Sequence, residues 1–136
     1  MLFNNMLLAR WNSTFYLLER IVELRRAIGL YEVEFGLDSK LSAAQWETLE
    51  KVICLVRPFE EFTKQVSSET ASVSTVIPYY ELLKELLEST LDNGVGSFRM
   101  KLLKGLKKHF SKYLESDVHI AATLLDPRFK ARFLRK

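Results

Sequence analysis

The sequence contains few of the residues that build disulfides, metal sites or phosphate loops. Its 136 residues include one cysteine, Cys54, and two histidines, which excludes an internal disulfide and a four-ligand zinc site. Because Cys54 lies between Ile53 and Leu55, we expect it to be a small buried apolar side chain. Glycine-rich phosphate loops, nucleophile elbows and H-E-x-x-H motifs are also missing. The sequence therefore predicts no catalytic residues, no metal site and no cofactor in this chain.

Long apolar runs are absent as well. No stretch approaches the ~20 consecutive apolar residues that cross a bilayer, and residues 1–8 lack the basic start and cleavage site of a secretory signal. Apolar residues make up 48% and charged residues 27%, which is ordinary for a soluble globular protein. We therefore expect one domain over residues 1–136, without membrane contact.

Positive charge is scarce in most of the chain and concentrated near its end. From Arg99 onward there are eleven basic and three acidic residues, whereas the first 98 residues hold nine basic and fourteen acidic ones. Such polarity is typical of a cationic face that meets phosphate, but also of a lysine-rich helix face that is merely solvated. Charge alone leaves both interpretations open.

The longest helical pattern runs from Ser42 to Val66. Ser42 and Gln45 form a capping-box sequence, in which each side chain accepts from the other residue's backbone N–H. Glu60 and other charged residues fall mostly on the outer face, and Pro58 predicts a kink or two abutting helices because it donates no N–H. The expected inner face has steps of three and four residues: Leu49, Val52, Ile53, Val56, Phe59, Phe62, Thr63 and Val66.

Four further segments have helical periodicity with end signals. They run from Thr14 to Ile28, from Ser74 or Thr75 to Leu91, from Gly96 to Leu114, and from an Asp117 cap to Leu125. We expect Gly29 to stop the first of them and Leu30–Lys40 to be a connector or a single helical turn, although its alternation also fits an edge strand. The predicted fold is all-α, an irregular bundle of four to five helices.

The segment from Gly96 to Leu114 is amphipathic. Its predicted inner residues are Met100, Leu103, Leu106, Phe110 and Leu114. The opposite side carries four lysines at steps of three, four and four residues: Lys101, Lys104, Lys108 and Lys112. They are the first candidates for contacts with phosphate.

Two short motifs remain. Arg10-Trp11-Asn12-Ser13-Thr14 places a cation and an indole ring before the expected helix start. Trp11 either packs back onto Leu17 or Leu18 or stacks on an unstacked base with Arg10 on phosphate. The second motif, Ala122 to Lys130, is a helix end with an Asp126-Pro127 turn, Phe129 inward and Arg128 and Lys130 outward.

Together these blocks resemble the hAT family of transposases and the host proteins derived from them, which often carry BED zinc fingers elsewhere. The matching blocks are Arg10–Arg20 ("RWNST…LER"), Leu41–Glu60 with its Pro58-Phe59 step, Ser74–Pro78 ("STVIP") and Ala122–Lys130 ("ATLLDPRFK"). They follow the family order and span nearly the whole chain. Residues 1–8 do not match the family's upstream segment.

The resemblance implies a helical insertion domain, which in the family interrupts an RNase H-like catalytic core. The family's three catalytic acids and its C-terminal dimerisation region would lie outside this chain, so a divalent metal is expected only in an intact parent enzyme. The resemblance also implies a nuclear protein, and for Trp11 it implies a role in holding a displaced base. Expected partners are DNA, bound weakly and without sequence choice, and the rest of the transposase core.

The expected DNA-contacting residues are Arg10, Trp11, Lys101, Lys104, Lys108, Lys112, Arg128 and Lys130. A rival hypothesis is a domesticated, transposase-derived scaffold that acts through protein–protein contacts. The sequence leaves the oligomeric state open.

Overall fold

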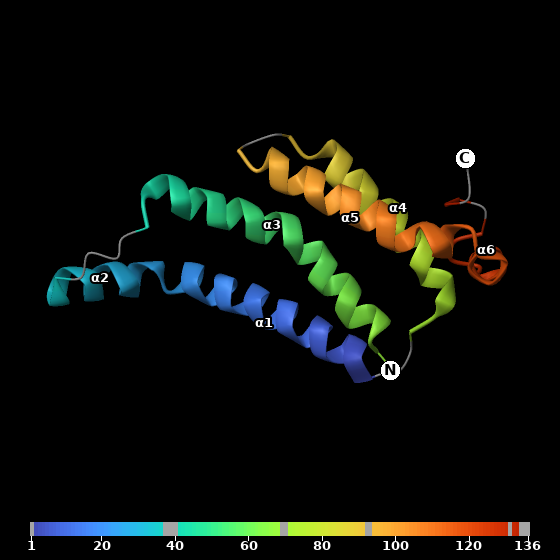
Figure 1. The fold of residues 1–136 in the computed structure, drawn as a ribbon, viewed down its shortest axis with the longest axis horizontal. Coiled ribbons are helices and arrows are strands. Elements are labelled where there is room, and N and C mark those ends of the chain that lie inside the picture. Colours follow the sequence, from blue (N-terminus) through green and yellow to red (C-terminus); the bar gives the residue numbers. More distant parts are fainter. Residues whose placement is uncertain (1, 37–40, 69–70, 92–93, 131, 134–136) are drawn as a thin grey trace. The chain divides into compact units, whose positions relative to one another are not determined.

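The computed structural model describes residues 2–36, 41–68, 71–91, 94–130 and 132–133, with side chains from Trp11 onward. In these ranges all regular structure is helical, which confirms the all-α prediction (Figure 1). Six α-helices and one 3-10 helix are present there, rather than four or five helices. They are α1 (Leu2–Glu23), α2 (Arg25–Phe35), α3 (Ala43–Val66), η1 (Val73–Thr75), α4 (Val76–Ser89), α5 (Gly96–Leu114) and α6 (Asp117–Leu125).

The chain divides into two compact units, residues 1–60 and 61–136, and each is described by itself. The single domain expected over residues 1–136 stays a prediction. Within the described ranges, none of the helices combines the length and the apolar character needed to span a membrane.

The first unit begins with a helix that is longer than expected. α1 starts at Leu2, so Arg10 and Trp11 lie inside a helix and the predicted start at Thr14 is wrong. The residues before Trp11 include several good helix formers, and the helix extends through them past the capping-type residues. A break at Leu24 separates α1 from α2, although the Leu24 N–H still donates to the Arg20 carbonyl at 3.0 Å.

α2 ends at Phe35 with Gly36 as its cap, so the helix does not stop at Gly29. Gly36 has φ 62°, and its N–H donates to the Glu32 carbonyl, an arrangement in which glycine is favoured because it lacks a Cβ. Gly29 lies inside α2, and Leu30–Phe35 continues that helix. Of the expected alternatives, the helical turn is the nearest, and neither a connector nor an edge strand forms at these residues. Residues 37–40 of the expected connector lie outside the described residues.

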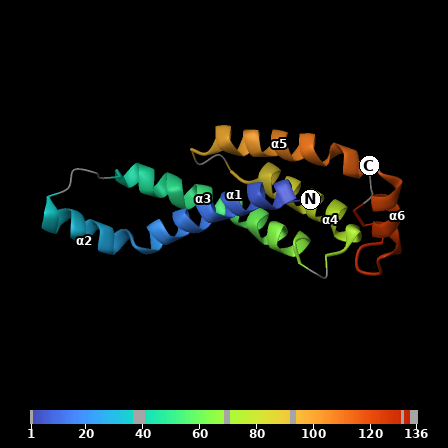
Figure 2. The same cartoon turned by 60° about the horizontal axis from the view of Figure 1, so that its bottom comes forward.

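The predicted capping box at the start of α3 is confirmed. The Ser42 N–H donates to Gln45 Oε1 at 2.8 Å, and the Gln45 N–H donates to Ser42 Oγ at 3.2 Å. α3 continues through Pro58 as one helix. Figures 1 and 2 show α2 continuing from α1 before the chain turns back into α3.

Four positions in α3 differ from the sequence prediction. Val66, expected on the inner face, is 37% exposed at the end of the helix. Leu55 is buried and Cys54 is exposed, because neighbouring residues of a helix point ~100° apart. Glu60, expected on the outer face, is buried, and it accepts a hydrogen bond from the Tyr16 hydroxyl of α1. Arg57 of α3 also contacts α1, because it pairs with Glu19 at 2.8 Å and lies over the Phe15 ring.

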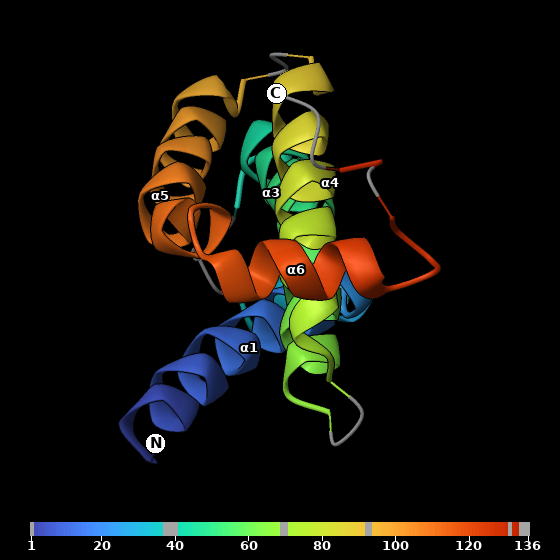
Figure 3. The same ribbon diagram turned by 90° about the vertical axis from the view of Figure 1, so that its right-hand side faces the viewer.

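The second unit packs η1, α4, α5 and α6 together. α6 crosses α4 in Figure 3, and it also contacts η1 and α5. An aromatic cluster lies on the α4–α5 side, with Phe62 5.0 Å from Tyr79 and Tyr80 5.7 Å from Phe110 between ring centroids. The fully or nearly fully buried apolar residues of these elements are Ile77, Pro78, Tyr80, Leu83, Leu87, Leu103 and Leu106.

Two expected caps and one expected core residue are corrected. Ser72, rather than Ser74, caps η1, and Thr75 precedes α4 without a side-chain cap bond. Ser116 precedes α6, so Asp117 is the first helical residue and not the cap. Met100 is 56% exposed, because its position on α5 lies ~100° from the buried side formed by Leu103 and Leu106.

Candidate functional site

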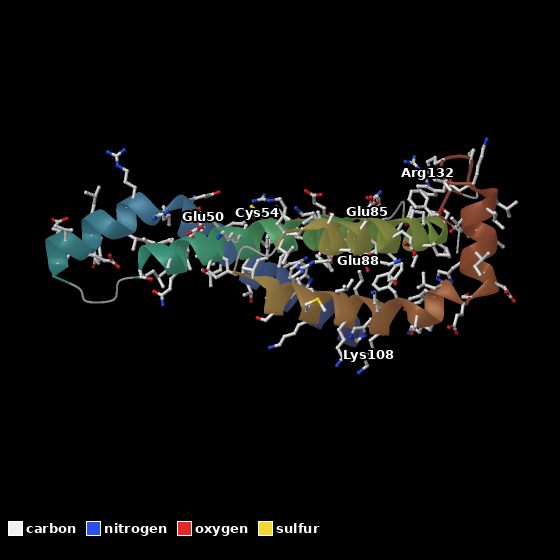
Figure 4. The ribbon with its side chains drawn as sticks, turned by 90° about the horizontal axis from the view of Figure 1, so that it is seen from above. Glu50, Cys54, Glu85, Glu88, Lys108 and Arg132 are labelled. Carbon is white, nitrogen blue, oxygen red and sulfur yellow. The ribbon has the colours of Figure 1, made fainter. Side chains whose placement is uncertain are left out.

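The four lysines predicted on α5 do lie on one exposed side of that helix. We call Lys101, Lys104, Lys108 and Lys112 the lysine face, and all four are exposed. Leu103 and Leu106 point the other way and are buried, which fixes the rotation of α5 and keeps the lysines outward. Figure 4 shows Lys108 on the side of α5 that faces away from α4.

Along the helix axis the lysine face spans ~16 Å, since an α-helix rises 1.5 Å per residue. No ion pair joins Lys101, Lys104 or Lys108 to another residue in the described part of the chain. The Lys112 ammonium lies 4.7 Å from the Tyr113 ring centroid, a cation–π contact. The lysine face therefore carries positive charge that no carboxylate on α5 compensates.

Lys107 lies on the same helix but, unlike the lysine face, it is paired with a carboxylate. Its Nζ lies 3.2 Å from Glu88 Oε1 on α4, with both side chains about half exposed. Lys107 is rotated about 60° or more away from every residue of the lysine face. Its charge is thus directed toward α4 rather than toward the lysine face.

Arg128 occupies a different environment from the one expected. Its Nη2 lies 2.7 Å and its Nε 3.0 Å from the two Asp126 carboxylate oxygens, and the guanidinium also lies 5.0 Å over the Phe129 ring. This fork geometry raises the pKa of Arg128. The Arg128 charge is largely compensated within the turn that follows α6.

The Asp126 carboxylate receives bonds from two sides. Besides Arg128, the Ser74 hydroxyl donates to Asp126 Oδ2 at 2.6 Å. The Arg128 guanidinium, and after it the Ser74 hydroxyl, hold the pKa of the Asp126 carboxyl well below its usual range. The Thr123 hydroxyl, which is fully buried, lies 3.2 Å from the Ser74 carbonyl oxygen and completes this network.

Sequence reasoning missed this network. Ser74 and Asp126 both fall in blocks that carry the family resemblance, but the two residues are separated by 52 positions. Their pairing depends on α6 crossing η1, which no local pattern encodes. The sequence contains one indirect indication of this pairing: the block with Ser74 begins a predicted helix, and the block with Asp126 ends one.

Lys130 is exposed and adopts a left-handed backbone with φ 50°. Its N–H donates to the Asp126 carbonyl oxygen at 3.0 Å, so the turn imposes this conformation on a residue other than glycine. Lys130 follows the Asp126–Arg128 pair closely, and it forms no ion pair with any residue that the structure describes. Six candidates lie in the second unit, Lys101, Lys104, Lys108, Lys112, Arg128 and Lys130. Figure 3 shows α5 and the segment that follows α6 on opposite sides of α4, so the four lysines of α5 and the two residues of the turn are separate groups.

Trp11 and Arg10 belong to the first unit. Trp11 is half-buried, with its ring centroid 6.2 Å from that of Phe15. Trp11 and Arg10 lie inside α1 and not before its start. Trp11 is therefore neither an exposed ring at the start of a helix nor part of a hydrophobic staple around that start. The side chain of Arg10 lies outside the described residues.

A hollow of about 510 Å³ lies between α4 and the residues that follow α6. Glu85, Glu88 and Arg132, which are labelled in Figure 4, are among its lining residues. In the described ranges, no group of three or more His, Cys, Asp or Glu residues is arranged to hold a metal ion.

Comparison with known proteins finds relatives that match nearly the whole chain. Zinc finger BED domain-containing protein 4 of Homo sapiens is 33% identical over 127 residues, which cover 90% of this chain and 11% of that protein. Zinc finger BED domain-containing protein 6 is 34% identical in Homo sapiens and 33% in Mus musculus, over 135 residues that cover 88% of this chain. This chain spans 11% to 13% of these relatives. No protein-family model and no solved structure matches it.

Proposed function

Because the chain belongs to the family of BED zinc finger domain-containing proteins derived from hAT transposases, we propose that it is the helical insertion region of such a protein. In this role it contacts DNA phosphates through the lysine face and has no complete active site of its own. The catalytic acids of a parent enzyme would lie outside these residues, together with any divalent metal. The parent protein would act in the nucleus.

The observation that carries the proposal is the uncompensated lysine face. Four exposed ammonium groups along ~16 Å of one helix side could face about five phosphates of one DNA strand, whose charges are spaced ~3.4 Å apart along the duplex axis. Lysine contacts a phosphate as a point charge, and a phosphate contact carries no information about base sequence. Binding through this face would therefore be weak, independent of sequence and sensitive to salt.

The other candidates have supporting parts in this proposal. Lys130 would offer a separate phosphate contact in the turn after α6, whereas Arg128 chiefly holds that turn through Asp126. Trp11 would stack on a displaced base, with Arg10 on a neighbouring phosphate. The half-buried state of Trp11 leaves part of the ring accessible for such a contact.

Fluorescence titration of a labelled DNA duplex at increasing salt tests the proposal. The wild-type chain should bind at ~50 mM salt and lose affinity steeply toward ~200 mM, because each phosphate contact releases counterions. The double variant Lys104→Gln/Lys108→Gln should lower the magnitude of the slope of log K against log salt by up to ~2, at ~0.9 for each contact.

The matched control removes the same charge from α3. The double variant Lys51→Gln/Lys64→Gln changes the net charge equally, but both of its positions lie outside the lysine face. The proposal predicts that this control keeps the wild-type slope. Absence of DNA binding at ~50 mM salt, or equal loss of slope in the two double variants, would overturn it.

A second candidate function is a scaffold that acts through protein–protein contacts. The observation that favours it is α2, which has no buried residue and exposes Leu30 and Val33. Contiguous exposed apolar side chains are typical of interaction surfaces. This function does not require the lysine face, so the DNA titration and an association assay separate the two.

A further inference from the structure

One side of α2 is apolar in its middle and oppositely charged at its two ends. We call Arg26, Ala27, Leu30, Val33 and Glu34 the α2 outer face. Steps of three and four residues place them on the same side of the helix, and all five are exposed. Leu30 and Val33 are 64% and 78% exposed, so this face presents apolar area to solvent between its two charged ends.

The opposite side of α2 is held against α3. The Arg25 guanidinium lies 5.1 Å from the Trp46 ring centroid and 3.0 Å from Glu50 Oε1. Arg25 points ~140° away from Leu30 around the helix. These contacts therefore turn the α2 outer face away from α3.

The charges on this face are symmetric about Leu30. Arg26 lies four residues before Leu30 and Glu34 four residues after it, and neither has an ion-pair partner among the described residues. If two copies of α2 pack antiparallel with Leu30 on the two-fold axis, Arg26 of each copy faces Glu34 of the other. Ala27 then faces Val33, so a small side chain meets a larger one in both halves.

We propose that the α2 outer face is a self-association surface, on which two copies of this chain pack with their α2 helices antiparallel. A parallel pair would place Arg26 against Arg26 and Glu34 against Glu34, which is unfavourable at both ends. One face of a short helix buries less than the ~800 Å² per partner of a standard interface. The dimer is therefore weak and concentration-dependent, and it acts by avidity in a longer protein.

Sedimentation equilibrium over a concentration series up to millimolar tests this surface. The wild-type chain should show a monomer–dimer equilibrium, and Leu30→Asp should abolish it by burying a carboxylate on the axis. Arg26→Glu and Glu34→Arg should each weaken the dimer by ~10-fold or more, because each variant alone puts like charges opposite one another twice.

Mixing the two charge variants gives the sharpest result. A heterodimer of Arg26→Glu and Glu34→Arg pairs opposite charges at both contacts, so the mixture should associate about as well as the wild-type chain. Val118→Asp, at a position on α6 that is 68% exposed, is the control and should leave association unchanged. Circular dichroism confirms that each variant keeps its helices.

A wild-type chain that stays monomeric throughout the series would overturn the proposal. So would charge variants that associate like the wild type, or a mixture of the two that stays monomeric. None of these substitutions touches the lysine face. DNA titration of the same proteins therefore distinguishes failure of this surface from failure of the proposed DNA contact.

Discussion

The Ser74 hydroxyl donates a 2.6 Å hydrogen bond to the Asp126 carboxylate, joining the segment that leads into α4 to the residue that ends α6. Ser74 is 3% exposed, and Arg128 binds the same carboxylate from the solvent side. The bond fixes α6 across η1 and so sets where the turn with Arg128 and Lys130 begins. Two blocks of the family resemblance thus meet at one carboxylate.

Ser74→Ala should lower the free energy of unfolding by ~1–2 kcal/mol, because it removes a buried hydroxyl and leaves Asp126 short of one donor. Urea denaturation followed by circular dichroism measures the change. Ser97→Ala is the control, since Ser97 is exposed in the first turn of α5. Equal midpoints for Ser74→Ala and the wild type would show that the bond does not stabilise the second unit.

The stability that Asp126 contributes should depend on pH in the acid range. Arg128, and then Ser74, lower the pKa of Asp126 in the folded state, whereas an unfolded aspartate titrates near ~3.9. A folded pKa below the unfolded one gives stability that is fully present above ~4 and is lost as the pH falls toward the folded value.

Comparison with Asp126→Asn isolates this dependence. The variant should be less stable than the wild type at neutral pH, and the difference should stay constant down to pH ~4 and narrow below it. Urea midpoints of both proteins across this range measure the difference. A gap that widens on acidification would contradict the assignment of the lowered pKa.

The features that the sequence predicts correctly are those with local causes. The Ser42–Gln45 capping box depends on residues three apart, and the outward side of α5 follows from helical periodicity around Leu103 and Leu106. Both signals are complete within one or a few turns of helix. The all-α class follows from the same patterns.

The features that the sequence-based prediction misses depend on distant partners or on competing local signals. Glu60 has the residue type of a surface position, but the Tyr16 hydroxyl, 44 residues away, gives its buried carboxylate a donor. The Asn12-Ser13-Thr14 run has capping residues yet lies within α1, because helix formers continue upstream of it. Ser74 and Asp126 need the crossing of α6 over η1 before they can meet.

The two glycines near α2 provide a paired test of backbone effects. Gly29 lies inside the helix, and a Cβ at this position would have no neighbouring atom within 4 Å, so Gly29→Ala should stabilise the first unit by ~0.5–1 kcal/mol. Gly36 has φ 62°, so Gly36→Ala should destabilise it by about 1 kcal/mol. Thermal unfolding measures both, and equal shifts of the same sign would contradict this assignment of the helix end.

The last prediction separates two lysines on one helix. Lys104 belongs to the lysine face, whereas Lys107 pairs with Glu88 at 3.2 Å. If DNA contacts only the lysine face, Lys104→Gln should reduce the salt slope of binding by ~0.9, and Lys107→Gln should change it much less. Both variants remove one charge, so a difference between them reports position rather than net charge. Equal slopes would mean that DNA senses the overall charge of α5, and the lysine face would then have no special role.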